Sequence, residues 1–213
     1  MSESSVEPIA VLVDDDEAVC EALGELLNSV GLDTMSFSSS TQLLEAKLPD
    51  RPSCIVLDVR MPGLSGLDLQ HHLAEHGIMT PIVFLTGHGD IAMSVQAMKS
   101  GAVDFLTKPV RDQTFLDAVS KAIETDIVRR CTAGEAQRNL KLYQALTPRE
   151  RQVLRFVVKG MLNKQIAFEL GISEVTVKLH RSSMMRKMHA TSTAQLFGAW
   201  QSMPAEIRAS TDG

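Results

Sequence analysis

Five short apolar runs, each followed by a segment with helical spacing, fill residues 9–127 of this 213-residue chain. An uninterrupted apolar run between turn residues is typical of a strand that is buried on both faces of a parallel sheet. Parallel neighbours require helical crossovers, which are right-handed. The alternation therefore predicts a five-stranded, doubly wound parallel sheet with helices on both faces. The expected strands are Ile9–Val13, Leu32–Phe37, Cys54–Leu57, Pro81–Leu85 and Ala102–Leu106.

Capping residues divide the intervening segments into helices. Gly31 and Gly101 follow helical patterns as C-terminal caps, and Ser38–Thr41 offers side chains that cap a helix N-terminus. Pro49 and Pro52 then close the second helix. The expected helices are 17–30, a short one through Leu48, Gly66–Glu75, Ile91–Ser100, and Asp112 to about Ile127.

Polar residues stand where four of the five strands end. Asp14 and Asp15 follow the first strand, Asp58 the third, Thr86 the fourth and Lys108 the fifth. In open parallel sheets these ends share one edge, and ligands bind beyond it. Three converging carboxylates repel one another unless a cation compensates, and hard oxygen ligands suit Mg²⁺. A carboxylate nucleophile, Mg²⁺, a hydroxyl and a lysine are the parts that phosphoryl transfer needs.

Taken in order, these motifs resemble the receiver domain of two-component response regulators, over about residues 8–125. The resemblance rests on Asp14-Asp15, Asp58-Val-Arg-Met-Pro-Gly63, Thr86-Gly-His-Gly89 and Lys108-Pro109. It implies a flavodoxin/CheY-like α/β fold, a Mg²⁺ cofactor and a sensor histidine kinase as phosphate donor. The implied site residues are Asp58 as phospho-acceptor, Asp15 and the Arg60 backbone carbonyl as metal ligands, Asp14 holding the metal's waters, and Thr86 and Lys108 at the phosphoryl group.

The resemblance also assigns roles around this site. Phe105 falls on the family's switch aromatic, where it lacks the hydroxyl of a tyrosine. Lys108-Pro109 is expected as a cis peptide, which is accessible to X-Pro bonds. Arg60 and His88 occupy variable positions that tune dephosphorylation in relatives. The resemblance thus implies a DNA-binding regulator and not an enzyme, with a receiver that accepts a phosphoryl group and autodephosphorylates.

A second set of helix signals begins at Leu146. Thr147, Pro148 and Glu150 form a capping box with proline at the first helical position, and the helix ends at Gly160. Asn163 is expected to cap the next helix, through Leu170, and Ser173 a third, to about Met188. Two short helices across a glycine-containing turn are typical of a helix-turn-helix.

Helical spacing assigns two faces to the third helix of this set. The spacing places Val177, His180, Met184 and Met188 inward, with packing and a phosphate contact both open for His180. The opposite face holds Glu174, Lys178, Arg181, Ser182 and Met185. A face with Lys178 and Arg181 is usually only solvated, but the turn motif and the local charge favour a DNA major groove.

Residues 142–206 resemble the LuxR-type helix-turn-helix, through Leu146-Thr-Pro-Arg-Glu150, Asn163-Lys-Gln-Ile-Ala167, Leu170-Gly-Ile-Ser173 and Thr176-Val-Lys-Leu-His-Arg181. With the receiver, the chain resembles a response regulator of the NarL/FixJ family. The family implies an all-α four-helix domain whose last helix, about Thr193–Met203, serves dimerisation. Base contacts are implied at Lys178 and Leu179, with Ser182 and Arg181 beside them, and phosphate contacts at Lys164, Thr176 and Lys187.

Charge divides the chain in the same way. Residues 1–123 hold 7 Lys and Arg against 18 Asp and Glu, whereas residues 142–213 hold 10 against 5. A basic C-terminal part suits a polyanion. The expected domains are 8–125 and 142–207, joined by a linker at 126–141 that extends the fifth helix and breaks near Gly134.

The rest of the sequence indicates an ordinary cytoplasmic protein. Cys20, Cys54 and Cys131 lack paired spacing, so reduced thiols are expected. The N-terminal residues 1–8 are polar and acidic, unlike a signal peptide, and no run approaches a membrane span. His72-Leu-Ala-Glu75-His76 fits a zinc-protease pattern but has no evident third ligand, so a solvated helix end is favoured.

The sequence thus predicts a phosphorylation-dependent transcriptional regulator that forms a homodimer, binds promoter DNA and contacts RNA polymerase. Three alternatives stay open. A phosphohydrolase would have a second acid two residues after its nucleophile, where this chain has Arg60. A nucleotide-binding α/β module would have a glycine-rich loop after its first strand. A regulator that binds DNA regardless of phosphorylation would have the same sequence features.

Overall fold

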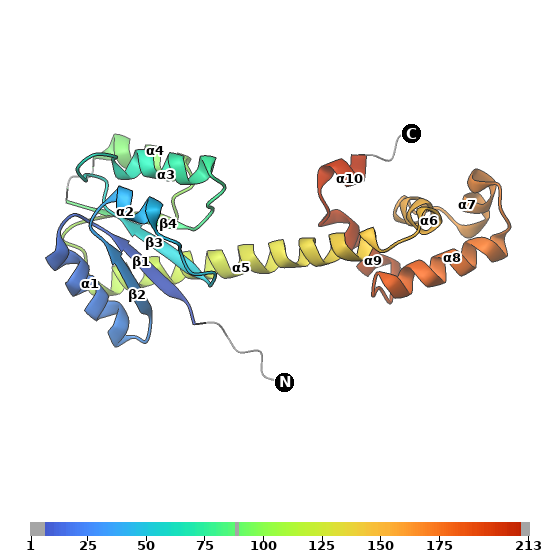
Figure 1. Ribbon diagram of the computed structural model, residues 1–213, viewed down its shortest axis with the longest axis horizontal. Coiled ribbons are helices and arrows are strands. Elements are labelled where there is room, and N and C mark those ends of the chain that lie inside the picture. The colour runs from blue at the N-terminus through green and yellow to red at the C-terminus, as the bar shows by residue number, and fades with distance from the viewer. Residues whose placement is uncertain (1–6, 88–89, 210–213) are drawn as a thin grey trace. The chain divides into compact units, whose positions relative to one another are not determined.

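The computed structural model describes residues 7–87 and 90–209. The chain divides into two compact units at residue 130. The first, here called the sheet unit, holds the strands, and the second, the helical unit, begins at Cys131. Figure 1 shows the elements of both units. The domain limits 8–125 and 142–207 stay predictions.

The sheet unit contains the predicted five-stranded parallel sheet, in the order β2-β1-β3-β4-β5. The chain runs from β1 outward to β2, returns past β1 to β3, and then continues outward through β4 to β5. The strand order therefore reverses between β1 and β3. Each register is parallel, so all carboxyl ends lie at one edge. The strands are β1 Ile9–Val13, β2 Asp33–Phe37, β3 Ser53–Leu57, β4 Ile82–Thr86 and β5 Asp104–Thr107.

Helices cover both faces of this sheet because every central strand is apolar on both sides. Ala10 and Leu12 of β1 pack into one core, whereas Val11 and Val13 pack into the other. The first core is covered by α1 and α5, and the second by α2, α3 and α4. The helices are α1 Glu17–Ser29, α2 Ser40–Glu45, α3 Gly66–Glu75, α4 Ile91–Lys99 and α5 Asp112–Gln144.

The fifth helix corrects the expected break near Gly134. It runs without interruption from Asp112 to Gln144. A glycine within a helix costs only about 1 kcal/mol relative to alanine. Both ends of α5 are fixed by packing: Phe115 is buried in the sheet unit and Tyr143 in the core of the helical unit. One glycine is therefore insufficient to break the helix.

Burial explains why Cys20 and Cys54 act as packing groups and not as reactive thiols. The described chain has no disulfide among its three thiols, and Cys20 and Cys54 are buried while Cys131 is exposed. Removal of the Cys54 thiol from water, together with the nearby Asp126 carboxylate, raises the pKa of Cys54 to about 12. That thiol stays protonated and packs as a small apolar group, as the sequence predicts.

The helical unit forms around one core that includes Val153, Ile166, Val177, Met184 and Leu196, all fully buried. Its helices are α6 Pro148–Val158, α7 Asn163–Leu170, α8 Glu174–Lys187, α9 Thr193–Gln201 and an unpredicted α10 Ala205–Ala209. No described helix is both long enough and apolar enough to cross a membrane.

Capping in the helical unit follows the prediction with one exception. The capping box of α6 forms, and the Ser173 hydroxyl caps α8. Asn163, expected as a cap, is instead the first residue of α7. Its side-chain oxygen accepts a hydrogen bond from Arg181, while the Gln165 side chain accepts one from the Leu162 N–H. The polar side chain that caps the turn therefore comes from the third helical residue.

Candidate functional site

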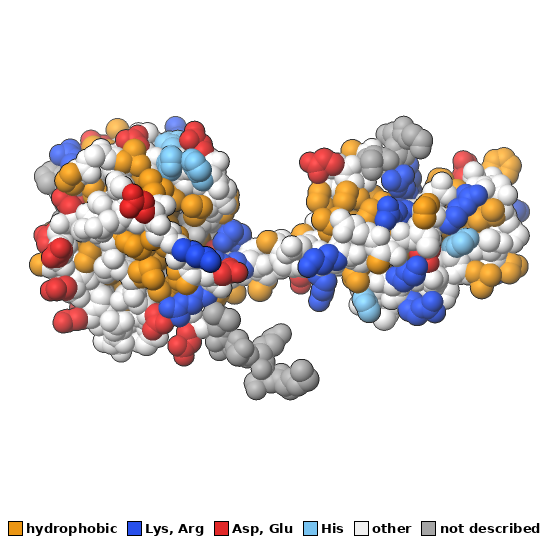
Figure 2. Space-filling model, viewed as in Figure 1, with side chains coloured by type: hydrophobic (Ala, Val, Ile, Leu, Met, Phe, Trp, Pro, Cys, Tyr) orange, Lys and Arg blue, Asp and Glu red, His pale blue; other side chains and the backbone are white. Residues whose placement is uncertain are grey.

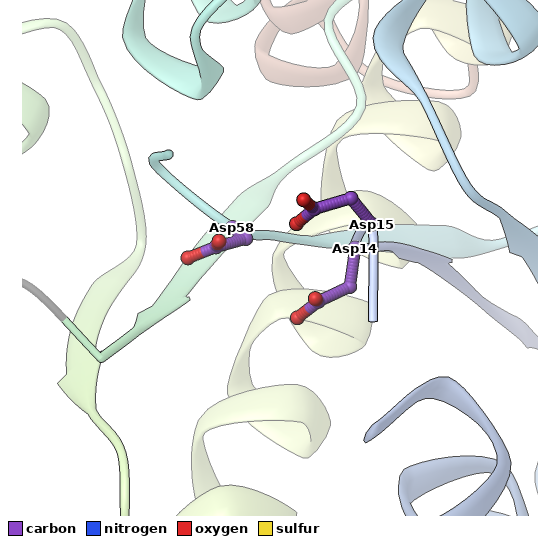
Figure 3. Close-up of side chains that lie close together, drawn as sticks. All are labelled: Asp14, Asp15 and Asp58. Carbon is purple, nitrogen blue, oxygen red and sulfur yellow. The ribbon is translucent and has the colours of Figure 1, made fainter. Parts of the chain in front are cut away.

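Three carboxylates meet at the carboxyl edge of the sheet. Asp14 and Asp15 follow β1, and Asp58 follows β3, so the strand order brings them together (Figure 3). Their nearest oxygens lie within 4.8 Å of one another. Asp14 and Asp58 are buried, whereas Asp15 is exposed. Among the described residues this is the only group of three or more carboxylate, imidazole or thiol ligands close enough for a metal ion.

The donor set of this cluster fits a hard divalent cation. Carboxylate oxygens are the ligands that Mg²⁺ prefers in proteins, usually with water in the remaining positions. Three carboxylates whose nearest oxygens lie within 4.8 Å of one another supply such donors. Asp58 Oδ1 also accepts a hydrogen bond from the Val59 N–H at 2.9 Å, which fixes the orientation of its carboxylate.

Lys108 supplies the positive charge in this cluster. Its ammonium donates to Asp14 Oδ2 at 2.5 Å, in a partly buried ion pair. The peptide bond from Lys108 to Pro109 is cis, as the resemblance implied. The backbone N–H of Lys108 donates to the Thr86 carbonyl at 2.8 Å, which holds the loop after β5 against the end of β4. Lys108 thus lies within the carboxylate cluster and compensates part of its negative charge.

The predicted hydroxyl and the predicted aromatic lie on neighbouring strands. Thr86 is fully buried at the end of β4. Phe105 of β5 is half-buried, and its ring centroid lies 5.9 Å from that of Phe84. Arg60 is exposed in the loop after β3. His88, the other variable position, lies outside the described residues.

Gly66 belongs to this site although the sequence analysis gave it no role. Its N–H donates to the Val59 carbonyl at 2.9 Å, and α3 therefore begins directly against the backbone of Asp58. A Cβ at position 66 would lie 2.2 Å from the Asp58 carbonyl oxygen. The signal available in the sequence was a glycine immediately after the Ser65 cap, where most side chains are otherwise allowed.

Gly66→Ala is therefore expected to slow phosphorylation of Asp58 at least about tenfold, because the Asp58 loop must move to admit a methyl group. The rate with acetyl phosphate and Mg²⁺ measures this, alongside thermal unfolding. Gly24→Ala is the matched control, since a Cβ there meets its nearest neighbour at an ordinary 3.6 Å. Equal rates for wild type and Gly66→Ala would show that the close approach does not position Asp58.

The alternative zinc pattern gains no support from the structure. His72 lies on α3 and His76 is the residue that caps its C-terminus, and their ring centroids lie 4.1 Å apart. His76 Nδ1 is within 2.8 Å of the His72 carbonyl oxygen, so a backbone group occupies it. Within the part of the chain that the structure describes, no third ligand joins them.

A second candidate site lies on the exposed face of α8, the second helix of the helix-turn-helix. Val177, Met184 and Met188 are buried as predicted, and His180 is half-buried. Lys178, Leu179 and Ser182 are exposed within one arc of about 100°. The same arc holds two exposed residues that the sequence analysis missed, Val175 and Arg186. A helical-wheel projection of the whole third helix, and not only of its first two turns, would have placed Arg186 on this arc.

Two predicted DNA contacts have partners within the domain. Arg181 is half-buried, and its guanidinium donates to Asn163 Oδ1 at 3.1 Å and to Thr193 Oγ1 at 3.2 Å. Its expected place on the exposed face is wrong, because these acceptors on α7 and α9 draw the side chain inward. Lys187 donates to the buried Glu150 carboxylate at 2.7 Å. Lys164 is exposed, and Thr176 is half-buried beside the Ser173 cap.

Charge is distributed as these two sites require. Figure 2 shows Asp and Glu side chains spread over the sheet unit, and Lys and Arg side chains more frequent on the visible face of the helical unit. An acidic site at a sheet edge and a helix-turn-helix with a cationic arc define a class of protein, the DNA-binding response regulators.

Comparison with known proteins identifies the family. The model of the response regulator receiver domain matches residues 10–120, and that of the bacterial regulatory proteins of the luxR family matches 144–198. Nodulation protein W of Bradyrhizobium diazoefficiens is 52% identical over 92% of this chain and 86% of its own length. Response regulator protein TodT of Pseudomonas putida is 47% identical over 88% of this chain and 83% of its own. The chain belongs to the NarL/FixJ family of response regulators.

Solved structures agree with this assignment. The response regulator StyR matches with a TM-score of 0.81 and 43% identity, over 92% of this chain and 99% of that one. Full-length FixJ from B. japonicum matches with a TM-score of 0.56 and 36% identity, over 93% of this chain and 98% of its own. The protein is therefore a response regulator with a receiver domain and a LuxR-type DNA-binding domain.

Proposed function

We propose that phosphorylation of Asp58 by a sensor histidine kinase controls dimerisation and sequence-specific DNA binding by this regulator. The observation that carries the proposal is the cluster of Asp14, Asp15 and Asp58, with the Lys108 ammonium paired to Asp14. A structural salt bridge needs one carboxylate, whereas three converging carboxylates repel one another unless a cation compensates their charge.

The residues divide the phosphoryl transfer between them. An Asp58 oxygen attacks the phosphorus of the donor, and the bond from phosphorus to the leaving group breaks. Mg²⁺ held by Asp14, Asp15, Asp58 and the Arg60 carbonyl would neutralise charge on the phosphoryl oxygens. The Lys108 ammonium leaves Asp14 for one of these oxygens, and the Thr86 hydroxyl donates to another. Autodephosphorylation, with Arg60 and His88 setting its rate, is the only hydrolysis proposed.

The change is then transmitted from Thr86, at the end of β4, to Phe105 on the neighbouring strand β5. Movement of the Thr86 side chain toward the phosphoryl group opens space for Phe105, whose ring lies near Phe84. Because interfaces and packed cores have discrete arrangements, such a shift would bias the surface around α4 and α5 between two states. We propose that this surface and α9 favour a homodimer.

In the helical unit, Lys178, Leu179 and Ser182 would face base edges, and Lys164 and Thr176 the phosphates. Arg181 and Lys187 would contact DNA only by sharing or releasing their present acceptors. RNA polymerase is the further partner of a transcriptional regulator. The bacterial chromosome lies in the cytoplasm, which is the proposed location.

The test compares wild type with Asp58→Asn, each with and without acetyl phosphate and Mg²⁺, by sedimentation and by binding to double-stranded DNA. Dimers and at least tenfold tighter, salt-sensitive DNA binding in the phosphorylated wild type alone are expected. Identical behaviour of both proteins would leave a regulator that binds DNA regardless of phosphorylation. Multiple turnovers of a small phosphoester would instead indicate a phosphohydrolase.

A further inference from the structure

Two apolar side chains stand on the exposed arc of α8. Val175 is 66% exposed and Leu179 is 67% exposed, although Val177 and Met184 of the same helix are fully buried. Residues four apart are neighbours on a helix surface. Long side chains also lean toward the helix N-terminus, so the Leu179 side chain covers the turn that carries Val175. The two residues therefore form one continuous apolar surface, here called the apolar pair.

The surroundings of the apolar pair favour a nucleic acid over another protein. Lys178 and Arg186, both exposed, lie on the same arc, with Ser182 between them. The only acid in the helix is Glu174, at its first residue. A protein partner for an apolar surface is usually apolar itself, with a rim of both charges. Cations without matching acids instead fit the DNA backbone.

The major groove offers one apolar group to such a pair. Each thymine presents a 5-methyl group there, and apolar side chains contact it. The N-terminal residues of a recognition helix are those that reach base edges. Val175 and Leu179 are the second and sixth residues of α8, so both lie in its first two turns.

We propose that Val175 and Leu179 bind the 5-methyl groups of thymines in the major groove, so that the preferred site carries thymine at two neighbouring positions. The inference rests on the proposed DNA-binding function and specifies its chemistry. Lys178, Ser182 and Arg186 then contribute hydrogen bonds and phosphate contacts, whereas the apolar pair discriminates thymine from cytosine.

Uracil isolates this interaction, because it pairs as thymine does and lacks only the methyl group. The phosphorylated full-length protein first selects binding fragments from a pool of random-sequence double-stranded DNA. Each thymine of the selected site is then replaced singly by uracil, and the affinity is measured. Loss of one buried methyl is expected to weaken binding about fourfold.

Alanine variants assign each methyl to a side chain. In Val175→Ala the effect of uracil is expected to vanish at one position, and in Leu179→Ala at the adjacent one. Both positions are exposed and helical, and alanine favours helix, so folding is retained. Phe168→Ala is the matched control, since Phe168 is a more exposed apolar residue on α7, and its uracil effects are expected to equal those of wild type.

The outcomes separate this inference from the proposed function. Selection of a defined site without any effect of uracil would overturn the inference and leave the DNA-binding function intact. Uracil effects that persist unchanged in both alanine variants would also overturn it. Absence of any selected site, with phosphorylated protein and at low salt, would overturn the proposed function and the inference together.

Discussion

Asp15→Asn is expected to slow Mg²⁺-dependent phosphorylation of Asp58 by acetyl phosphate on the order of 100-fold or more. Asp14 is already paired with Lys108, and Asp58 is the proposed nucleophile. Asp15 is therefore the carboxylate in the cluster whose only proposed role is to hold the metal ion. An amide retains the shape of the side chain but loses its negative charge. Phosphorylation is measured as the fraction of modified protein over time, at several Mg²⁺ concentrations.

Asp16→Asn is the control for this substitution. Asp16 carries the same side chain one residue later, but it caps α1 by accepting from the N–H groups of Ala18 and Val19. Asparagine is an equally good cap, so phosphorylation by this variant is expected to match wild type. If excess Mg²⁺ restored Asp15→Asn fully, Asp15 would affect only affinity for the ion. Equal rates in Asp15→Asn and wild type would remove Asp15 from the site.

Lys187→Met is expected to lower the free energy of unfolding of the helical unit by about 3 kcal/mol. Glu150 is 4% exposed, and its carboxylate accepts from the Lys187 ammonium at 2.7 Å and from the Thr147 N–H at 2.8 Å. Loss of the ammonium leaves a buried charge with only neutral donors, a change that typically costs 3–5 kcal/mol. The lower end applies because Lys187 itself is one-third exposed. Denaturant unfolding of the full-length protein, followed by the Trp200 fluorescence, measures it.

The double variant tests whether the cost arises from the unpaired charge. Glu150→Gln combined with Lys187→Met removes both charges and retains the shape of the capping box. It is expected to be more stable than Lys187→Met alone, because no buried charge is left uncompensated. Lys159→Met serves as control, since Lys159 is an exposed lysine in the same domain. Equal destabilisation by Lys187→Met and Lys159→Met would mean that the ion pair contributes nothing measurable.

The ion pair between Glu150 and Lys187 also makes the stability of the helical unit sensitive to acid. Burial raises the pKa of Glu150, but hydrogen bonds from Lys187, Thr147 and Ser183 outweigh it and lower the pKa from 4.5 to about 2. A folded-state pKa below the unfolded value contributes stability above pH 4.5, and this contribution disappears as the pH falls from 4.5 toward 2. The Glu150→Gln variant is accordingly expected to lose less stability than wild type across this pH range.

Most strands and helices of the sheet unit were predicted from local sequence patterns. The strand Ile9–Val13 and the helix Gly66–Glu75 begin and end where predicted, because an apolar run between turn residues and a capped helix both carry their limits in sequence. Asp14, Asp15 and Asp58 were also predicted to meet, since the carboxyl ends of parallel strands share one edge of the sheet. The short α2 ends at Glu45 and not near Leu48: the backbone is extended at Ala46, and Leu48 packs against the core from outside the helix.

Some features depended on contacts between residues far apart in the chain. Arg181 was assigned to the exposed face by spacing, yet Asn163 and Thr193 hold it half-buried. Gly66 acquires its role only because α3 begins against the Asp58 backbone. The break expected at Gly134 fails because both ends of α5 are packed in cores. In each case the deciding group is supplied by another element.

The sequence by itself determined the class of fold, the order of the two domains, and the carboxylates, hydroxyl and lysine of the proposed phosphorylation site. Periodicity, capping residues and strand ends are local properties, and local pattern is sufficient to read them. The tertiary structure decided which cations remain available: Lys178 and Arg186 are exposed, whereas Lys187 is paired with Glu150. A charged side chain is free or occupied according to its neighbours in space, and spacing along one helix does not specify them.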